Sequence, residues 1–234
     1  MTEESEHMLE QLSNNTYCPN HSSVAVVTTG IGSVYAAMEI TKNIITNPPD
    51  VILNVGCAGA HNPSLAIGDV IVGNEVIPTS NVIVDHMNNF KLYGVRNRTD
   101  SNSVLSWKSD ERLLNIMSDI ILKTQSDPDM PFVTLLGRIA SSDTWNDNVQ
   151  TVTRLYDRYE TQCEEMEAAS IGQIANHYSI PFLPIKDISN SVHVTENIFT
   201  PHEHIVPHIC GKNAAVVAKM LVDTLLCDTT FEIN

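Results

Sequence analysis

Two acidic residues at the predicted start of a helix are the first candidates for chemistry in this sequence. Glu165 and Glu167 flank Met166, where an apolar pattern predicts a helix over 167–178. A carboxylate at such a place can accept two hydroxyl hydrogen bonds at once, as a sugar would offer them. Acids are also common at helix starts, because they interact favourably with the helix dipole. The residue types therefore fit both a sugar-binding site and a solvated helix start.

Two glycine-containing segments can bring backbone amides close to a ligand. Gly30-Ile31-Gly32 lies between a predicted strand and a predicted helix, and Gly56-Cys57-Ala58-Gly59 is a small-residue turn after a second strand. Glycine leaves no side chain between the backbone and a bound molecule, and the first turn of a helix offers unpaired N–H groups. A tight turn of purely structural purpose has the same composition. Both segments are candidate binding loops.

Histidines near the C-terminal end raise the question of a metal site. His202, His204 and His208 are spaced HxHxxxH, with Glu203 between the first two. Prolines at 201 and 207 break any helix that would align the ring nitrogens. We therefore expect a solvated loop here and no metal site.

These segments are embedded in an alternation of short strands and longer helices. Strands are predicted at the β-branched runs 24–28, 51–55, 70–72 (extending toward 77), 131–139 and 181–185. Helices are predicted by their apolar spacing at 33–45, 109–123, 149–159, 167–178 and 212–226. This alternation predicts an α/β fold with three layers, α/β/α, around a central sheet that is mostly parallel and partly mixed. Ligands of such sheets bind at the carboxyl ends of the strands.

Composition and charge narrow the class of protein. The chain has 234 residues, 42% of them hydrophobic and 18% charged, which suits a single domain over 1–234. A net charge of −15 repels polyanions, so neither nucleic acid nor a membrane is an expected partner. Five widely spaced cysteines without a CxxC pair argue against a disulfide framework. With no secretory signal and no membrane-length apolar run, a cytoplasmic protein is expected.

Four segments, taken in chain order, give the sequence a family resemblance. They are Thr29–Ser33; Asn54–Gly59 with Ile67–Asp69; Glu165–Ala168; and Ile188–Asn190. Together they resemble the methylthioadenosine and S-adenosylhomocysteine nucleosidases, and more distantly the purine and uridine phosphorylases. The resemblance extends from about residue 24 to residue 226. It implies a nucleoside-cleaving enzyme of the nucleoside phosphorylase fold that needs no metal or other cofactor.

The resemblance assigns the sugar to the Glu165–Glu167 segment. Met166 would pack against the sugar, Glu167 would accept its ribose hydroxyls, and Lys186 could support the Glu167 carboxylate. The family has a serine near the anomeric carbon where this chain has Cys57, which is a poorer hydrogen-bond partner.

The base is assigned to residues 141–146 and 188–190. Trp145, beside Asn146, stands where the family stacks an aromatic residue on the purine. The nucleosidases have aspartic acid in place of Asn190, as the general acid that protonates purine N7 while the sugar becomes an oxocarbenium ion. Asparagine can donate a hydrogen bond but no proton. Some phosphorylases that prefer 6-oxopurines have asparagine here, so the substitution can shift the substrate rather than abolish activity.

The N-terminal residues also depart from the family pattern. Residues 1–9 resemble the end of an acidic cluster whose preceding strand is missing, and the alignment makes Glu4 the general base that activates water. The alternative is a frayed, solvated acidic terminus. A general base must lie within hydrogen-bond reach of its water, so the position of Glu4 decides between these readings.

Three functions remain open. Asn54 stands where the phosphorylases have an arginine for phosphate, and Arg138 and Arg154 match no phosphate motif, so water is the expected nucleophile. The leading hypothesis is hydrolysis of the N-glycosidic bond of a purine nucleoside. The alternatives are a purine or uridine phosphorylase, and a nucleoside-binding or storage protein that has lost the chemistry. The resemblance also implies a homodimer, in which the polar stretch 88–110 is the candidate loop over the neighbour's substrate.

Overall fold

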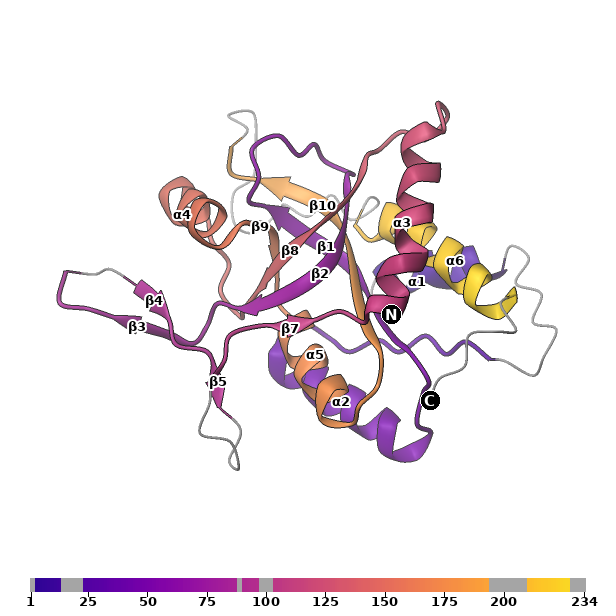
Figure 1. Ribbon diagram of the computed structural model, residues 1–234, viewed down its shortest axis with the longest axis horizontal. Helices are drawn as coiled ribbons and strands as arrows, with labels where there is room; N and C mark the ends of the chain where they lie inside the picture. The colour runs from indigo at the N-terminus through magenta and orange to yellow at the C-terminus, as the bar shows by residue number, and fades with distance from the viewer. Residues whose placement is uncertain (1–2, 14–22, 88–89, 97–102, 194–209, 228–234) are drawn as a thin grey trace.

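A six-stranded sheet forms the centre of the computed structural model, which describes residues 3–13, 23–87, 90–96, 103–193 and 210–227 (Figure 1). Its strands are β1 (Ile52–Ala60), β2 (Val70–Pro78), β7 (Trp107–Lys108), β8 (Thr134–Ser141), β9 (Thr161–Glu165) and β10 (Phe182–Ser191). They are ordered β10-β1-β9-β8-β2-β7, and β10 also pairs with β2. This extra pairing closes five of the strands into a ring.

The long strand pairings are parallel and the short ones antiparallel. β1 runs parallel to β10, and β8 runs parallel to β2 and β9. The antiparallel pairings β1–β9, β10–β2 and β2–β7 each join two or three residue pairs. The prediction of an α/β fold with a mostly parallel, partly mixed sheet is therefore confirmed.

Helices cover the sheet on two sides (Figure 1). On one side α1 (Glu3–Ser13), α3 (Glu111–Ser126) and α6 (Lys212–Cys227) pack on β2 and β10 through one apolar cluster that includes Met8, Leu113 and Leu221. On the other side α2 (Ser33–Thr46) and α5 (Ala168–His177) pack on each other and on Ile52 and Phe182. α4 (Val149–Tyr159) lies beside β9.

Local sequence explains where several helices begin. The Asp110 carboxylate accepts hydrogen bonds from the backbone N–H groups of Arg112 and Leu113, which caps α3. Asn148 caps α4 in the same way by accepting from the N–H of Thr151. The predicted helices at 33–45, 109–123, 149–159, 167–178 and 212–226 are all present, with ends that shift by up to three residues.

Two elements differ from the predictions at the N-terminal end. The predicted strand 24–28 is wrong, because these residues form no regular structure and Val24 and Val27 are 38% and 37% exposed. A β-branched run needs a paired edge to become a strand, and none pairs with it among the described residues. The predicted end of an acidic cluster is instead the helix α1, whose Met8 and Leu12 pack on the first apolar cluster.

The predicted turn at 56–60 is also wrong, and a strand was missed. Residues 56–60 continue β1 and pair with β10, from Gly56 opposite Lys186 to Ala60 opposite Ser191, with a register shift between Ala58 and Gly59. Glycine within a strand makes room for neighbouring side chains, which is its purpose here. Buried and half-buried residues alternate along the missed strand β9, so it lacks the continuous apolar run that marked the predicted strands.

Residues 88–110 contain several short strands, and within this range the structure does not describe residues 88–89 and 97–102. β4 (Phe90–Leu92) pairs with β3 (Val82–Val84), and β5 (Val95–Arg96) pairs with β6 (Ser103–Val104). Figure 1 shows the β3–β4 hairpin extending away from the central sheet, while β7 returns to it. None of the helices in the described residues has the length and apolarity needed to cross a membrane.

Candidate active site

A buried ion pair lies at the junction of β9, α5 and β10. The Lys186 ammonium donates to Glu165 Oε2 at 3.0 Å, and both side chains are only 2% exposed. Glu165 also accepts from the backbone N–H groups of Glu167 and Ala168, at 2.9 to 3.1 Å, and thereby caps α5. The Glu165 carboxylate is thus fully engaged within the protein, which makes it a positioning group for the residues that follow.

Glu167 connects this turn to the first glycine segment. The backbone N–H of Gly32 donates to Glu167 Oε1 at 2.7 Å, across 135 residues of sequence. Burial raises the pKa of Glu167 above its ordinary value, although the nearby Lys186 ammonium opposes the shift. Lys186 supports Glu167 through its charge, while its hydrogen-bonded partner is Glu165 rather than the expected Glu167.

The carboxylate of Glu4, which belongs to α1, also lies close to Lys186. Glu4 Oε1 accepts the backbone N–H of Cys57 at 3.0 Å. A Cβ added to Gly56 would lie 2.9 Å from Glu4 Oε1 and 3.2 Å from Lys186 Nζ, so the missing side chain makes room for both groups. Burial acts to lower the pKa of Lys186, but Glu165, Glu167 and Glu4 outweigh it and raise the pKa.

Cys57 is held as a neutral thiol. A hydrogen bond with the Cys210 thiol, burial and the negative charge of Glu4 together raise the pKa of Cys57 well above its ordinary value. A thiol nucleophile needs the opposite shift. The side chain at the position of the family's serine therefore has no feature of a covalent catalyst.

Asp187, next to Lys186, holds the start of α6. Its carboxylate accepts from the N–H groups of Gly211, Asn213 and Ala214 at 2.9, 2.9 and 3.2 Å. Gly211 in turn lies against Glu4, because an added Cβ would be 2.9 Å from Glu4 Cγ. Sequence reasoning missed Asp187, and its only signal was a carboxylate inside a buried strand.

Of the predicted base-recognition residues, Asn190 lies beside Gly59, and Asn146 contacts Glu164, the partner of Gly59 on β9. On β10, Asn190 Nδ2 lies 3.1 Å from the position of a Gly59 Cβ, and Asn190 Oδ1 accepts the Ser189 hydroxyl at 2.9 Å. Trp145 is 53% exposed in the loop between β8 and α4. Asn146, the next residue, donates through its backbone N–H and its side-chain amide to Glu164.

The loop before α2 is held by a residue that lies far from it in sequence. Asp143 accepts from the backbone N–H of Ser33 at 2.7 Å and from its hydroxyl at 2.5 Å. It therefore serves as the N-terminal cap of α2 from 110 residues away. Gly30 and Gly32 have φ of +79° and +95°, a region that favours glycine, and Ile31 between them is 72% exposed.

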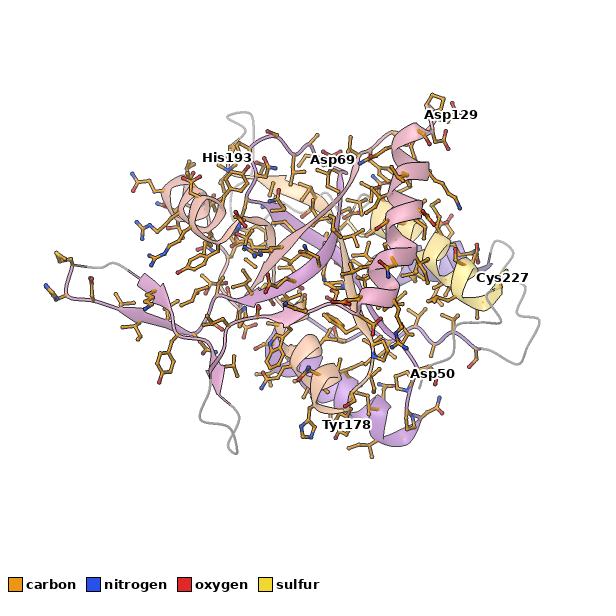
Figure 2. The ribbon with its side chains drawn as sticks, viewed as in Figure 1. Asp50, Asp69, Asp129, Tyr178, His193 and Cys227 are labelled. Carbon is orange, nitrogen blue, oxygen red and sulfur yellow. The ribbon has the colours of Figure 1, made fainter. Side chains whose placement is uncertain are left out.

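The other residues singled out above differ in how close they lie to these carboxylates. Ala58 is buried in β1, and Met166 is half-buried between Glu165 and Glu167. Arg138 donates to Glu75 and Glu160 at 2.7 and 2.8 Å, away from these residues. His193 follows β10 (Figure 2), and its ring contacts the carbonyl oxygen of His61 at 3.0 Å. The histidines at 202, 204 and 208 lie outside the described residues.

This fold and site define a class of proteins. The sequence matches the phosphorylase superfamily over residues 3–226, and the chain belongs to that family. The 5′-methylthioadenosine/S-adenosylhomocysteine nucleosidase of Staphylococcus haemolyticus is 29% identical over 174 residues, covering 73% of this chain and 70% of the relative. The nucleosidase of the same name from Lysinibacillus sphaericus is 26% identical over 199 residues, covering 85% and 80%. The predicted resemblance is confirmed.

Solved structures agree on the fold. The 5′-methylthioadenosine/S-adenosylhomocysteine nucleosidase of Neisseria meningitidis, in complex with methylthio-immucillin-A, matches with a TM-score of 0.71 at 21% identity and covers 96% of both chains. The futalosine hydrolase of Helicobacter pylori also matches with a TM-score of 0.71, at 19% identity, covering 96% of this chain and 94% of the hydrolase.

Proposed function

We propose that this chain is a purine nucleosidase, which uses water to cleave the bond between ribose and base. The observation that supports this most directly is the placement of Glu4 and Glu167 around Gly56, Cys57 and Lys186. One carboxylate comes from α1 and the other from the start of α5, so sugar and water can be held together beside the middle of β1.

In this proposal Glu4 is the general base and Glu167 binds the ribose hydroxyls. Glu4 Oε1 accepts the N–H of Cys57, which fixes the carboxylate while its second oxygen can accept a proton from water. Glu167 Oε1 is fixed in the same manner by Gly32, and its second oxygen can accept a hydroxyl. Lys186 keeps the group of carboxylates close together by charge.

The local charge favours water over phosphate. Glu4, Glu165 and Glu167 surround the single ammonium of Lys186, so the site carries excess negative charge that repels a phosphate dianion. Asn54 contributes no charge, and the guanidinium of Arg138 is paired with two glutamates elsewhere. Phosphorolysis would need a cation directed at the sugar.

Base release from a panel of nucleosides tests this function. The panel contains methylthioadenosine, S-adenosylhomocysteine, adenosine, inosine, guanosine and uridine, each with and without phosphate. We expect release without phosphate, a loss of kcat by at least about 100-fold in Glu4→Gln, and a loss of kcat/KM by at least about tenfold in Glu167→Ala.

Glu160→Gln is the matched control, because Glu160 pairs with Arg138 at the surface and its side chain is 76% exposed. Strict dependence on phosphate would make the protein a phosphorylase. Nucleoside binding without release of any base would make it a binding protein instead.

We also propose that the active form is a cytoplasmic homodimer. Ile31, Val34, Tyr35 and Met38 form an exposed apolar stripe along the start of α2, with exposed fractions of 51% to 76%. The stripe directly adjoins Gly32, so a second subunit seated on it would border the sugar site. Within the described part of the chain, Cys57, Cys163, Cys210 and Cys227 form no disulfide, which is in keeping with a reducing compartment.

A further inference from the structure

A carboxylate without an assigned role lies beside the base position. Gly59 of β1 is paired with Glu164 of β9 on one side and with Asn190 of β10 on the other. The Glu164 side chain is 15% exposed, so part of it is open to solvent. A purine placed against Gly59 would have Glu164 on one side of its edge and Asn190 on the other.

The Glu164 carboxylate is built into a fixed network. His61, whose side chain is fully buried, contacts Glu164 Oε2 at 3.0 Å through Nε2 and Thr161 Oγ1 at 2.8 Å through Nδ1. Asn146 donates to both oxygens of Glu164, at 3.1 Å from its backbone N–H and 2.5 Å from its amide. Asn146 donates to both oxygens and the His61 ring contacts Oε2, so the Glu164 carboxylate is held in one position.

The network leaves Glu164 one role toward a ligand, that of an acceptor. Three donors occupy about three of the four acceptor positions of the carboxylate, which leaves room for one more donor from the exposed side. Asn190 offers the opposite character, because the Ser189 hydroxyl occupies its Oδ1 and the amide Nδ2 faces Gly59. The two sides of the base position thus present a donor and an acceptor.

We infer that Glu164 is a specificity-determining residue that selects a 6-oxopurine base. The edge of hypoxanthine or guanine carries an acceptor, O6, next to a donor, N1–H. Asn190 Nδ2 can donate to O6 and N7, and Glu164 can accept N1–H. Adenine has a donor at position 6 and an acceptor at N1, so it would face Asn190 and Glu164 with both groups mismatched. The inference rests on the proposed function, because it takes the purine base to bind beside Gly59.

Calorimetric titration of free bases into the full chain tests this inference without relying on turnover. We expect hypoxanthine to bind at least about tenfold more tightly than adenine or 1-methylhypoxanthine, which lacks N1–H. In Glu164→Gln the affinity for hypoxanthine should fall at least about tenfold while that for adenine is kept or improved. Glu160→Gln should behave as the wild type.

Several outcomes would overturn the inference. In the wild type these are equal affinity for adenine and hypoxanthine, unimpaired binding of 1-methylhypoxanthine, or no binding of any base. In Glu164→Gln it is an equal loss of affinity for hypoxanthine and adenine, which would indicate that Glu164 only supports the loop. The titration with 1-methylhypoxanthine uses the wild type and stays informative even if the variant fails to fold. Base selection without nucleoside hydrolysis would refute the proposed function and leave this inference standing, whereas hydrolysis with adenine selection would do the reverse.

Discussion

At the scale of single residues, the site depends on carboxylates in sharply different surroundings. Glu165 is held by Lys186 and by two backbone N–H groups, while Glu4 and Glu167 each have one oxygen fixed by a backbone N–H. Carboxylates with one oxygen fixed are suited to contact a ligand, because their position is set before the ligand arrives. The residue type alone does not distinguish these roles; the number of protein donors does.

Asp187 gives a prediction about stability and pH. Burial raises the pKa of Asp187 from 3.8 to about 6, even though three backbone N–H groups favour the ionised form. Because the pKa of Asp187 is higher in the folded state, its protonated carboxyl stabilises the folded state fully below pH 3.8. This stabilisation is lost as the pH rises through about 6. Urea unfolding should therefore show the wild type losing on the order of 3 kcal/mol relative to Asp187→Asn between pH 4 and pH 7.

Asp110→Asn is the matched comparison, because Asp110 also caps a helix. Burial acts to raise the pKa of Asp110, but Arg112 and the backbone N–H groups outweigh it and lower the pKa below 3.8. Its stabilising contribution is present above 3.8 and is lost as the pH falls. The two variants should thus differ from the wild type with opposite pH slopes. Parallel slopes would show that Asp187 is not proton-linked to folding.

At the scale of elements, side chains of neighbouring strands fill the space at some strand positions, and these positions require glycine. Gly73 of β2 faces Pro184 of β10 and Ile139 of β8, and the β2–β8 register shifts between Gly73 and Glu75. Pro184 lacks the N–H that a strand residue normally donates, and the missing side chain of Gly73 leaves room for its ring. The ring of strands that presents Lys186 and Asn190 depends on this contact.

Gly73→Ala should therefore destabilise the fold more than Gly137→Ala. An added Cβ at Gly73 would lie 2.6 Å from Pro184 Cγ and 2.7 Å from Ile139 Cδ1, both in the rigid core. At Gly137 it would lie 2.3 Å from Gln162 Cγ, a side chain that can rotate away. We expect a cost of about 1 to 3 kcal/mol for Gly73→Ala and less for Gly137→Ala, measured by urea unfolding. Equal costs would contradict this account.

At the scale of the whole molecule, exposed apolar side chains gather on α2 and on β3. Val82, Ile83 and Val84 of β3 are 36% to 58% exposed, in addition to the stripe on α2. Contiguous apolar surface of this kind is typical of an interface. Since the α2 stripe adjoins Gly32, dimer formation and the order of the sugar site are expected to be linked.

The double variant Val34→Asp with Met38→Asp should dissociate the dimer. Two charges placed in the centre of an apolar interface are costly to bury, so sedimentation should show a monomer where the wild type is a dimer. Leu122→Asp on α3, where Leu122 is 64% exposed, is the control and should stay dimeric. A monomeric wild type, or a double variant that still dimerises, would refute this interface.

Sequence patterns alone determined the fold class, most helices and the residue types of the site. Apolar periodicity located α2 to α6, since burial of one helix face fixes the spacing of apolar residues. The motifs around Gly30, Gly56, Glu165 and Asn190 were enough for the family, because all four occur together and in the family's order along the chain. The N-terminal helix and β9 were not predicted, because the structure of a short polar segment is determined by the elements that pack against it.

Tertiary structure alone decided which of these residues meet. Glu4 reaches Cys57 because Met8 anchors α1 beside α6, and Asp143 caps α2 from 110 residues away. Glu164 and Asn190 lie on either side of Gly59 because β1 pairs with both β9 and β10, with a register shift between Ala58 and Gly59. Such contacts are set by strand register and packing across the molecule, and no local pattern in the chain encodes them.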